Sequence, residues 1–304
     1  MTATSTVGKT RRSIVERALS FVRRQVTQWA LLFRFSLRNH FSGSKIVDEN
    51  GEVVVSVTTF AARIAHVYAA IESVGVGSVL PGRIILWVAH EDLELVARTR
   101  SLQRLVRRGL EILAADGSLG SHKKYFPALV HESTERSFLV TADDDIFYPR
   151  QWLEKLWTAF VDDDRNTIVS SWVKRIAFVA DGMAPYTSWQ TTASSGEDAL
   201  NYFMSGSGTI YPRAYLNELV DAGETFRSLA PKADDVWLNM VAARAKIAVR
   251  QSTGEPLRIW TVPRTQRTKL STFNVIQSLN DVQLAATYSS ELITRLRTVR
   301  GKDN

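Results

Sequence analysis

The stretch Ser137 to Arg150, SFLVTADDDIFYPR, places three consecutive aspartates directly after a run of residues fit for a buried strand. Adjacent carboxylates repel one another and are poor strand formers, so the strand should end where they begin. Burying them without a partner would be costly, which predicts either exposure at a sheet edge or cationic side chains close by. The apolar and aromatic residues that follow return the chain to the core at once.

Strands and helices alternate on the N-terminal side of this stretch. The expected strands are 52–59, 83–89, 110–115 and 137–142, several of them apolar on both faces as buried parallel strands are. The expected helices are 63–74, 90–108 and 123–132. This order predicts a doubly wound α/β sheet flanked by helices, in which ligands bind beyond the carboxyl ends of the strands. The three aspartates follow such an end.

The chain beyond Tyr148 follows a looser pattern. The expected elements are a helix over 149–160, one or two strands in 167–179, a helix that begins within 229–245, and helical structure over 269–300. A polar loop over 180–196, which carries Tyr186 and Trp189, is a candidate lid facing the substrate.

The composition limits the kinds of protein that this chain can be. With 304 residues, 45% of them hydrophobic and 23% charged, the chain is ordinary globular material. The absence of cysteine excludes disulfides, thiolate metal sites and cysteine nucleophiles, and it fits a reducing, cytoplasmic location. None of the five histidines lies beyond His131 and no paired spacing occurs, so a histidine-rich zinc site is not expected.

The net charge of +7 comes from one end of the chain. Residues 1–45 hold nine lysines and arginines against the single acid Glu16, whereas 46–304 hold 29 basic and 30 acidic residues. Nucleic-acid binding typically needs a basic surface with interleaved aromatic residues, which the larger part lacks. Nucleic acid is therefore not an expected partner. The chain divides into a basic helical arm, 1–45, and a main domain, 46–304.

The arm has the pattern of an amphipathic helix. Its apolar residues recur three or four apart, at Val15, Leu19, Val22, Val26, Trp29, Phe33, Leu37 and Phe41. Arginines surround this stripe, and its longest unbroken apolar run is too short to cross a bilayer or to serve as a signal peptide. A basic helix over 11–41 suits the anionic inner face of a cell membrane. The stripe equally fits packing on the main domain or on a second copy in a homo-oligomer.

Six motifs follow one another in an order that resembles a known family. They are VVVSVTTFAARI (53–64), RIILWVA (83–89), GSHKKYFPAL (120–129), FLVTADDDIFYP (138–149), SGSGTIYP (205–212) and KADDVWLN (232–239). Together they are similar to bacterial glycosyltransferases with the GT-A fold, of the kind found in capsular and surface polysaccharide assembly. The resemblance implies a GT-A-like, Rossmann-type mixed sheet and transfer of a sugar from a nucleotide diphosphate sugar to a glycan or lipid-linked acceptor. An inactive homologue that serves as a binding or scaffolding partner is the alternative.

The Asp-x-Asp frame of the first triplet suits a divalent cation. Hard cations take carboxylate oxygen, and Mn²⁺ or Mg²⁺ shared with a diphosphate needs only one or two protein carboxylates. Asp143 and Asp145 are the predicted metal ligands, and Asp143 and Asp144 are candidates for contact with the nucleotide. Many GT-A enzymes add a C-terminal histidine, which this chain lacks, so the cation would rest on Asp145 and the diphosphate or on a further acid. A second triplet, 162–164, follows no strand and is expected to be a solvated turn.

The resemblance also implies which residues bind the donor. Thr58, Thr59 and Arg63, after the first strand, would hold the base and ribose, although Arg63 is equally compatible with the surface of the next helix. Glycine and serine before Lys123 and Lys124 let backbone N–H groups and an ammonium group face one diphosphate. Lys124 is the favoured ligand, and its neighbour is expected to be a solvated helix residue.

Two later motifs supply the remaining candidates. Inverting sugar transfer needs a base that takes the proton of the attacking acceptor hydroxyl, and the resemblance assigns this role to Asp235 with Asp234 beside it. Both aspartates equally suit a helix N-cap, favoured by the helix dipole. Gly206 and Ser207 would let the backbone approach the sugar closely, or would form a tight turn before a strand.

Overall fold

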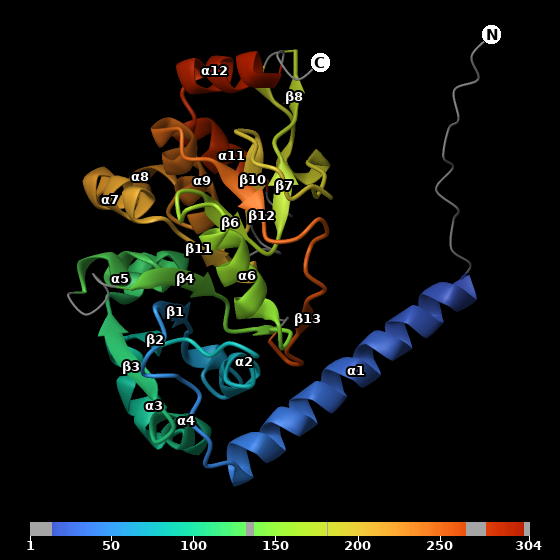
Figure 1. Ribbon diagram of the computed structural model, residues 1–304, viewed down its shortest axis with the longest axis vertical. Coiled ribbons are helices and arrows are strands. Elements are labelled where there is room, and N and C mark those ends of the chain that lie inside the picture. The colour runs from blue at the N-terminus through green and yellow to red at the C-terminus, as the bar shows by residue number, and fades with distance from the viewer. Residues whose placement is uncertain (1–13, 132–136, 181, 266–277, 301–304) are drawn as a thin grey trace.

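A seven-stranded sheet forms the centre of the computed structural model, which describes residues 14–131, 137–180, 182–265 and 278–300 (Figure 1). In spatial order the strands are β12 (Val249–Gln251), β6 (Ile168–Ser170), β11 (Thr209–Ile210), β4 (Phe138–Ala142), β1 (Val53–Thr58), β2 (Arg83–Ala89) and β3 (Leu110–Ala115). Neighbouring strands from β4 to β3 are parallel, whereas β11 is antiparallel to both β4 and β6. The predicted α/β fold, a mixed sheet flanked by helices, is confirmed.

The strand β1 separates the two main apolar cores. Val53, Val55 and Val57 pack among residues of α2 (Tyr68–Val74), α4 (Arg100–Val106) and α6 (Trp152–Val161). Val54 belongs to the opposite core, with residues of α5 (Phe126–Val130) and α9 (Asp234–Ala245). Side chains of a strand alternate between its faces, so both faces of this central strand are apolar. Each buried valine contributes about 1.5–3 kcal/mol relative to an exposed one.

The predicted helices between the first strands are interrupted. The segment 63–74 forms η1 (Ala61–Arg63) and α2, and 90–108 forms η2 (His90–Asp92), α3 (Leu93–Arg98) and α4. Thr99 divides the last two because its ψ of 98° is extended. Lys123 and Lys124 were expected to begin a helix, but they end η3 (Gly117–Lys124) instead. The helix α5 starts after them, with Pro127 in its first turn. Residues 132–136 lie outside the described part of the chain.

The later part of the chain surrounds one end of the sheet with further helices and short two-stranded pairs. The helices are α7 (Arg213–Ala222), α8 (Phe226–Leu229), α9, α11 (Leu279–Thr287) and α12 (Ser290–Arg300), with short turns η5 (Tyr186–Ser188) and η6 (Ser205–Ser207). The strand pairs are β5 (Ile146–Phe147) with β13 (Trp260–Thr261), β7 (Val173–Arg175) with β10 (Asn201–Phe203), and β8 (Phe178–Val179) with β9 (Gly182–Met183). The helix predicted over 149–160 starts later, at Trp152, and 269–277 of the predicted C-terminal helical region are not described.

The helix α1 (Ile14–Phe41) is held by its C-terminal half. Phe35 stacks on Phe147 and packs with Val262, and Gln28 donates a hydrogen bond to Thr261. In Figure 1 the C-terminal end of α1 lies beside α4, and its N-terminal end stands apart from the sheet. Within the described residues, no helix combines the length and apolar character needed to cross a bilayer.

A fully buried carboxylate fixes the same half of α1. Glu72 of α2 accepts hydrogen bonds from Nε of Arg38 at 3.0 Å and from Nδ2 of Asn39 at 3.1 Å, both on α1. Arg108 also pairs with Glu72. The helix therefore contributes polar groups that satisfy a buried charge of the main domain.

Candidate active site

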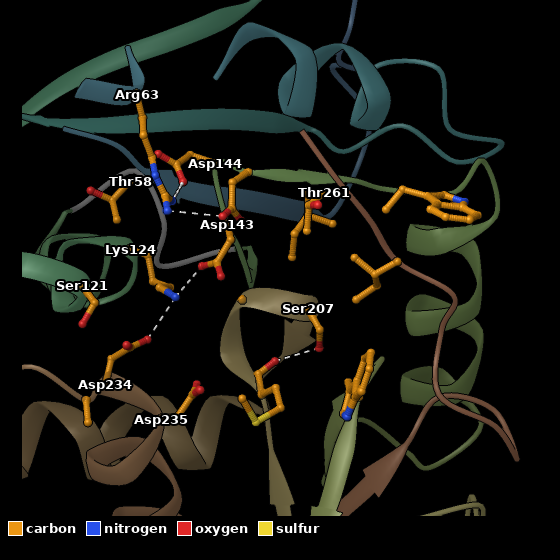
Figure 2. Close-up of a pocket in the computed structure, with 18 of the residues that line it drawn as sticks. Thr58, Arg63, Ser121, Lys124, Asp143, Asp144, Ser207, Asp234, Asp235 and Thr261 are labelled. Carbon is orange, nitrogen blue, oxygen red and sulfur yellow. Dashed lines mark hydrogen bonds and ion pairs between the residues drawn. The ribbon is translucent and has the colours of Figure 1, made fainter. Parts of the chain in front are cut away.

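A cleft of about 1620 Å³ lies beyond the carboxyl ends of β1 and β4. All predicted site residues line it: Thr58, Thr59, Arg63, Lys123, Lys124, Asp143, Asp144, Asp145, Gly206, Ser207, Asp234 and Asp235. The register explains part of this, because Val57 lies opposite Ala142 and the residues after both strands emerge at one edge. In Figure 2, Asp234 and Asp235 lie on the other side of the cleft from Thr58 and Arg63.

Arg63 is one of the cations that the aspartate triplet requires. Its Nη1 lies 2.6 Å from Oδ1 of Asp144, and its Nη2 lies 3.3 Å from Oδ2 of Asp145. Thr59 donates a hydrogen bond of 2.7 Å to the other oxygen of Asp144. Asp144 and Asp145 are only 4% and 6% exposed, so this pairing offsets the cost of burying them. Arg63 is thus buried beside the triplet and does not lie on the surface of a helix.

Lys124 is the second cation and reaches across the cleft edge. Its Nζ lies 2.6 Å from Oδ1 of Asp143 and 3.0 Å from Oδ2 of Asp234 (Figure 2). It also donates a 3.3 Å hydrogen bond to Oγ of Ser205. The backbone of Lys124 is held by Ser56 of β1, whose hydroxyl donates to the Lys124 carbonyl at 2.6 Å. Burial disfavours the charged amine, but Asp143 and then Asp234 raise the pKa of Lys124 well above its ordinary value.

Lys123 is also buried, which differs from the solvated position expected for one of the two lysines. Its Nζ makes a 3.5 Å hydrogen bond to the carbonyl of Thr59, and burial lowers its pKa, opposed first by Asp92. The three N–H groups of Lys124 are directed at Asp143, Asp234 and Ser205, whereas the long contact to Thr59 leaves Lys123 with donors for a further anion.

The aspartates at the start of α9 differ from one another. Ala233 is the N-cap and no side chain caps the helix, so neither aspartate has the N-cap role. Ser205 contacts both, its N–H donating to Oδ1 of Asp235 and its hydroxyl to Oδ2 of Asp234, each at 2.8 Å. Burial opposes ionisation of Asp234, but Lys124 holds its pKa below the ordinary value. Burial and the charge of Asp234 raise the pKa of Asp235 to about 7.

Gly206 is required by the position of Asp143. A Cβ at Gly206 would lie 1.9 Å from Oδ2 of Asp143, far inside contact distance. Tyr148 fixes the same pair, because its hydroxyl accepts from the N–H of Asp143 and donates to the carbonyl of Gly206, both at 2.7 Å. The hydroxyl of Ser207 is turned toward the carbonyl of Met204 at 2.8 Å.

The acidic residues fit a divalent cation only if a diphosphate completes its coordination. Within the described ranges, no group of three or more histidines, cysteines, aspartates or glutamates is placed to hold a metal. Asp143 and Asp145 both line the cleft, and the side chain of Asp143 is 38% exposed. Two such carboxylates suffice for Mn²⁺ or Mg²⁺ that also binds phosphate oxygens. The second triplet, 162–164, is at the end of α6, where Asp162 and Asp164 are exposed.

Several cleft residues were not predicted from the sequence. Lys174 of β7 lies 3.9 Å from the ring centroid of Tyr186, and Arg258 lies over the ring of Trp260 at the outer part of the cleft. The spacing of these residues carried no signal, because they come from separate short elements. Of the expected lid aromatics, Tyr186 lines the cleft, whereas Trp189 is buried in the core and donates to the carbonyl of Ala184.

No protein-family model and no curated protein sequence matches this chain. Solved structures of similar shape include 4-diphosphocytidyl-2C-methyl-D-erythritol synthase from Anaerococcus prevotii, with 13% identity, a TM-score of 0.45, and coverage of 76% of this chain and 100% of that one. A fragment of TarS from S. aureus has 18% identity and a TM-score of 0.43, with coverage of 69% and 59%. The mannosyltransferase PcManGT from Pyrobaculum calidifontis, in complex with GDP-Man and Mn²⁺, has 14% identity and a TM-score of 0.43, with coverage of 88% and 72%.

Proposed function

We propose that this chain is a glycosyltransferase that moves a sugar from a nucleotide diphosphate sugar to an acceptor hydroxyl. The observation that carries the proposal is that Asp235, whose pKa is about 7, lines the same cleft as the lysines Lys123 and Lys124. The carboxylates of Asp143 and Asp145 line this cleft as well. A base with a pKa near the working pH suits proton abstraction, and buried ammonium groups suit a diphosphate leaving group.

The donor would occupy the edge formed by the ends of β1 and β4. Thr58, Thr59 and Arg63 would contact the base and ribose, since all three line the cleft, and Thr58 and Arg63 lie on the side away from Asp234 and Asp235. Lys123 has N–H donors for the diphosphate, and the backbone of η3 before it adds further donors. Lys124 would then have a positioning role, holding Asp143 and Asp234 in place. Gly206 and Ser207 would border the sugar.

Asp143 and Asp145 would hold a divalent cation together with the diphosphate, and the chemistry that this cation would supply is neutralisation of phosphate charge. Asp144 has a different task in this arrangement. Its two oxygens are taken by Thr59 and Arg63, so it keeps Arg63 aimed at the nucleotide end of the cleft.

The transfer itself would use Asp235 as the base. Its carboxylate accepts the proton of the acceptor hydroxyl while the hydroxyl oxygen bonds to the anomeric carbon. The bond from that carbon to the diphosphate oxygen breaks, and its electron pair leaves with the diphosphate, whose charge Lys123 stabilises. Attack opposite to the leaving group inverts the anomeric configuration. Ser205 N–H, at 2.8 Å from Oδ1 of Asp235, keeps the carboxylate oriented.

Ligand-dependent melting and product release test this proposal together. Because a ligand that binds the native state raises the melting temperature, UDP-, GDP- and dTDP-sugars are compared with and without Mn²⁺. The donor that stabilises the protein most is then incubated with it, and release of the nucleoside diphosphate is followed with and without candidate glycan or lipid-linked acceptors. We expect stabilisation and release. Stabilisation without release with any acceptor would favour an inactive, scaffolding homologue, and no stabilisation would refute the donor site.

A further inference from the structure

The outward face of α1 carries a continuous stripe of large apolar side chains. Its members are Val15, Leu19, Val22, Val26, Trp29, Phe33, Leu37 and Phe41, each between 43% and 77% exposed. They recur every three or four residues along a helix of 28 residues, which is about 42 Å long. Contiguous apolar surface of this extent is uncommon on a protein that has no partner for it.

The stripe cannot be covered by turning α1 on the main domain. Phe35 and Asn39 occupy the opposite face and are 4% and 1% exposed. Asn39 and Arg38 satisfy the buried carboxylate of Glu72, and rotating the helix would leave that charge with fewer partners. The packing of this face therefore fixes the stripe outward.

The charges of α1 indicate the chemistry of what covers it. Arg23, Arg24 and Arg34 are exposed on the helix, and Glu16 is its one acidic residue. A second copy of the helix packed on the stripe would bring these arginines together with only Glu16 of each copy as an acidic partner, which disfavours a coiled-coil pair. A surface of anionic headgroups above an apolar layer complements both the stripe and the arginines.

The stripe also borders the cleft. Leu19 belongs to the stripe and lines the cleft, and Arg23 and Arg24 line the cleft as well. Arg258, in the segment before β13, lines the same cleft. A flat surface that accepted the stripe would thus hold the outer part of the cleft at the level of the headgroups.

We propose that α1 docks in the plane of an anionic lipid bilayer, with its stripe among the acyl chains and its arginines at the headgroups. This binding does not depend on the proposed transferase activity, since none of the stripe residues has a role in the proposed transfer.

Vesicle co-sedimentation of the full chain tests the docking. Binding to vesicles of phosphatidylcholine mixed with phosphatidylglycerol is compared with binding to phosphatidylcholine alone, at low and high salt. We expect binding to the anionic vesicles that weakens at high salt. The double variant Val26→Asp/Phe33→Asp should lose it, whereas Val282→Asp, which changes a 62% exposed valine on α11, should bind like the parent.

Arginine variants separate the charge from the stripe. Arg23→Gln/Arg34→Gln should weaken binding to anionic vesicles about 30-fold, at roughly 1 kcal/mol for each charge at the surface. All variants change exposed residues, and equal melting temperatures check that they remain folded. Vesicle binding by Val26→Asp/Phe33→Asp at the parental level would overturn the proposal. A parental dimer that this variant dissociates, with no vesicle binding by either, would assign the stripe to a second copy and also overturn it.

Discussion

Lys124 connects Asp143 to Asp234, with its Nζ 2.6 Å from an oxygen of the first and 3.0 Å from an oxygen of the second. Asp143 follows β4 and Asp234 begins α9, so a single ammonium group joins the sheet edge to the helix on the other side of the cleft. The like charges of the two carboxylates are offset by this cation. The cleft geometry therefore depends on Lys124 before any ligand binds.

Replacing Lys124 should destabilise the fold, and replacing Lys123 should not do so to the same degree. Lys124→Met leaves Asp234 buried without its cation, and we expect a loss of about 3 kcal/mol, the low end for breaking a buried pair because Asp143 is partly exposed. Lys123→Met removes one long hydrogen bond and should mainly weaken nucleoside diphosphate affinity. Urea unfolding and calorimetric titration measure the two effects. Equal losses of stability would contradict the assignment of separate tasks.

The role of Asp235 as base predicts that binding and rate separate. Asp235→Asn keeps an oxygen that can accept from Ser205 N–H, so donor affinity should stay near the parental value. Loss of the base should lower the transfer rate by about 10² to 10⁴. Asp234→Asn is the matched comparison, because it weakens the ion pair with Lys124 and should lower the free energy of unfolding as well. Transfer by Asp235→Asn at the parental rate would refute the assignment.

Stability should depend on pH through the same residue. Asp235 has a pKa of about 7 in the folded protein against an ordinary value of 3.8, so the folded state binds this proton more tightly than the unfolded chain does. Its contribution to stability therefore falls as pH rises from about 4 to about 7. Asp235→Asn should be more stable than the parent, by a margin that grows by roughly 2.6 kcal/mol between pH 5 and pH 8. A margin independent of pH, measured by urea unfolding, would show that the carboxyl titrates normally.

The transfer rate should follow the same ionisation. The base must be unprotonated, so kcat should rise with pH up to about 7 and then level off as Asp235 becomes fully ionised. A rate profile measured from pH 5 to pH 9 at saturating donor checks this. A profile that is flat below pH 7 would exclude Asp235 as the group that accepts the proton.

Nucleotide binding should depend on a divalent cation through the first aspartate triplet. Asp145→Asn should lower the affinity for a nucleoside diphosphate in Mn²⁺ and have a much smaller effect in EDTA. Asp162→Asn changes an exposed aspartate of the second triplet, at the end of α6, and should have no effect in either condition. Parallel calorimetric titrations of both variants decide the point. Equal, small changes in affinity for the two variants would contradict the proposal that Asp145 binds a metal.

Gly206→Ala should displace the carboxylate of Asp143. A Cβ there would lie 1.9 Å from Oδ2 of Asp143, whereas a Cβ at Gly182 would meet no atom within 4 Å. We expect Gly206→Ala to weaken Mn²⁺-dependent nucleotide binding at least tenfold and Gly182→Ala to leave it unchanged. If both variants bind alike, the close approach does not control the position of Asp143.

Much of the sheet and of the cleft was predictable, for a specific reason. Val53 to Val57 and the run before Asp143 are apolar on both faces, which only a central strand between two cores requires. Because parallel strands end at one edge, the residues after them had to meet. The need for cations near three aspartates was likewise evident, and Arg63 and Lys124 meet it.

Other features depend on contacts between distant segments, which periodicity does not report. Lys124 was expected to face a ligand, but Asp234 reaches it from a helix 110 positions later. The apolar periodicity of α1 also could not predict which face of the helix packs on the main domain, because that face combines Phe35 with the polar Gln28 and Asn39. These polar residues make hydrogen bonds whose partners the local sequence cannot identify. The more apolar face is the one left outward.

The shared border of the stripe and the cleft affects how the enzyme would meet its acceptor. With α1 lying on a bilayer, the cleft would be held at the membrane surface, because Leu19, Arg23 and Arg24 of α1 line it. The cleft would then move only within the plane that contains lipid-borne molecules. Diffusional search is then two-dimensional, and the encounter rate follows the number of acceptors per unit of membrane area instead of their concentration in bulk solution. Diluting the acceptor with inert lipid at constant total acceptor would slow the reaction, although no constant of the active site had changed.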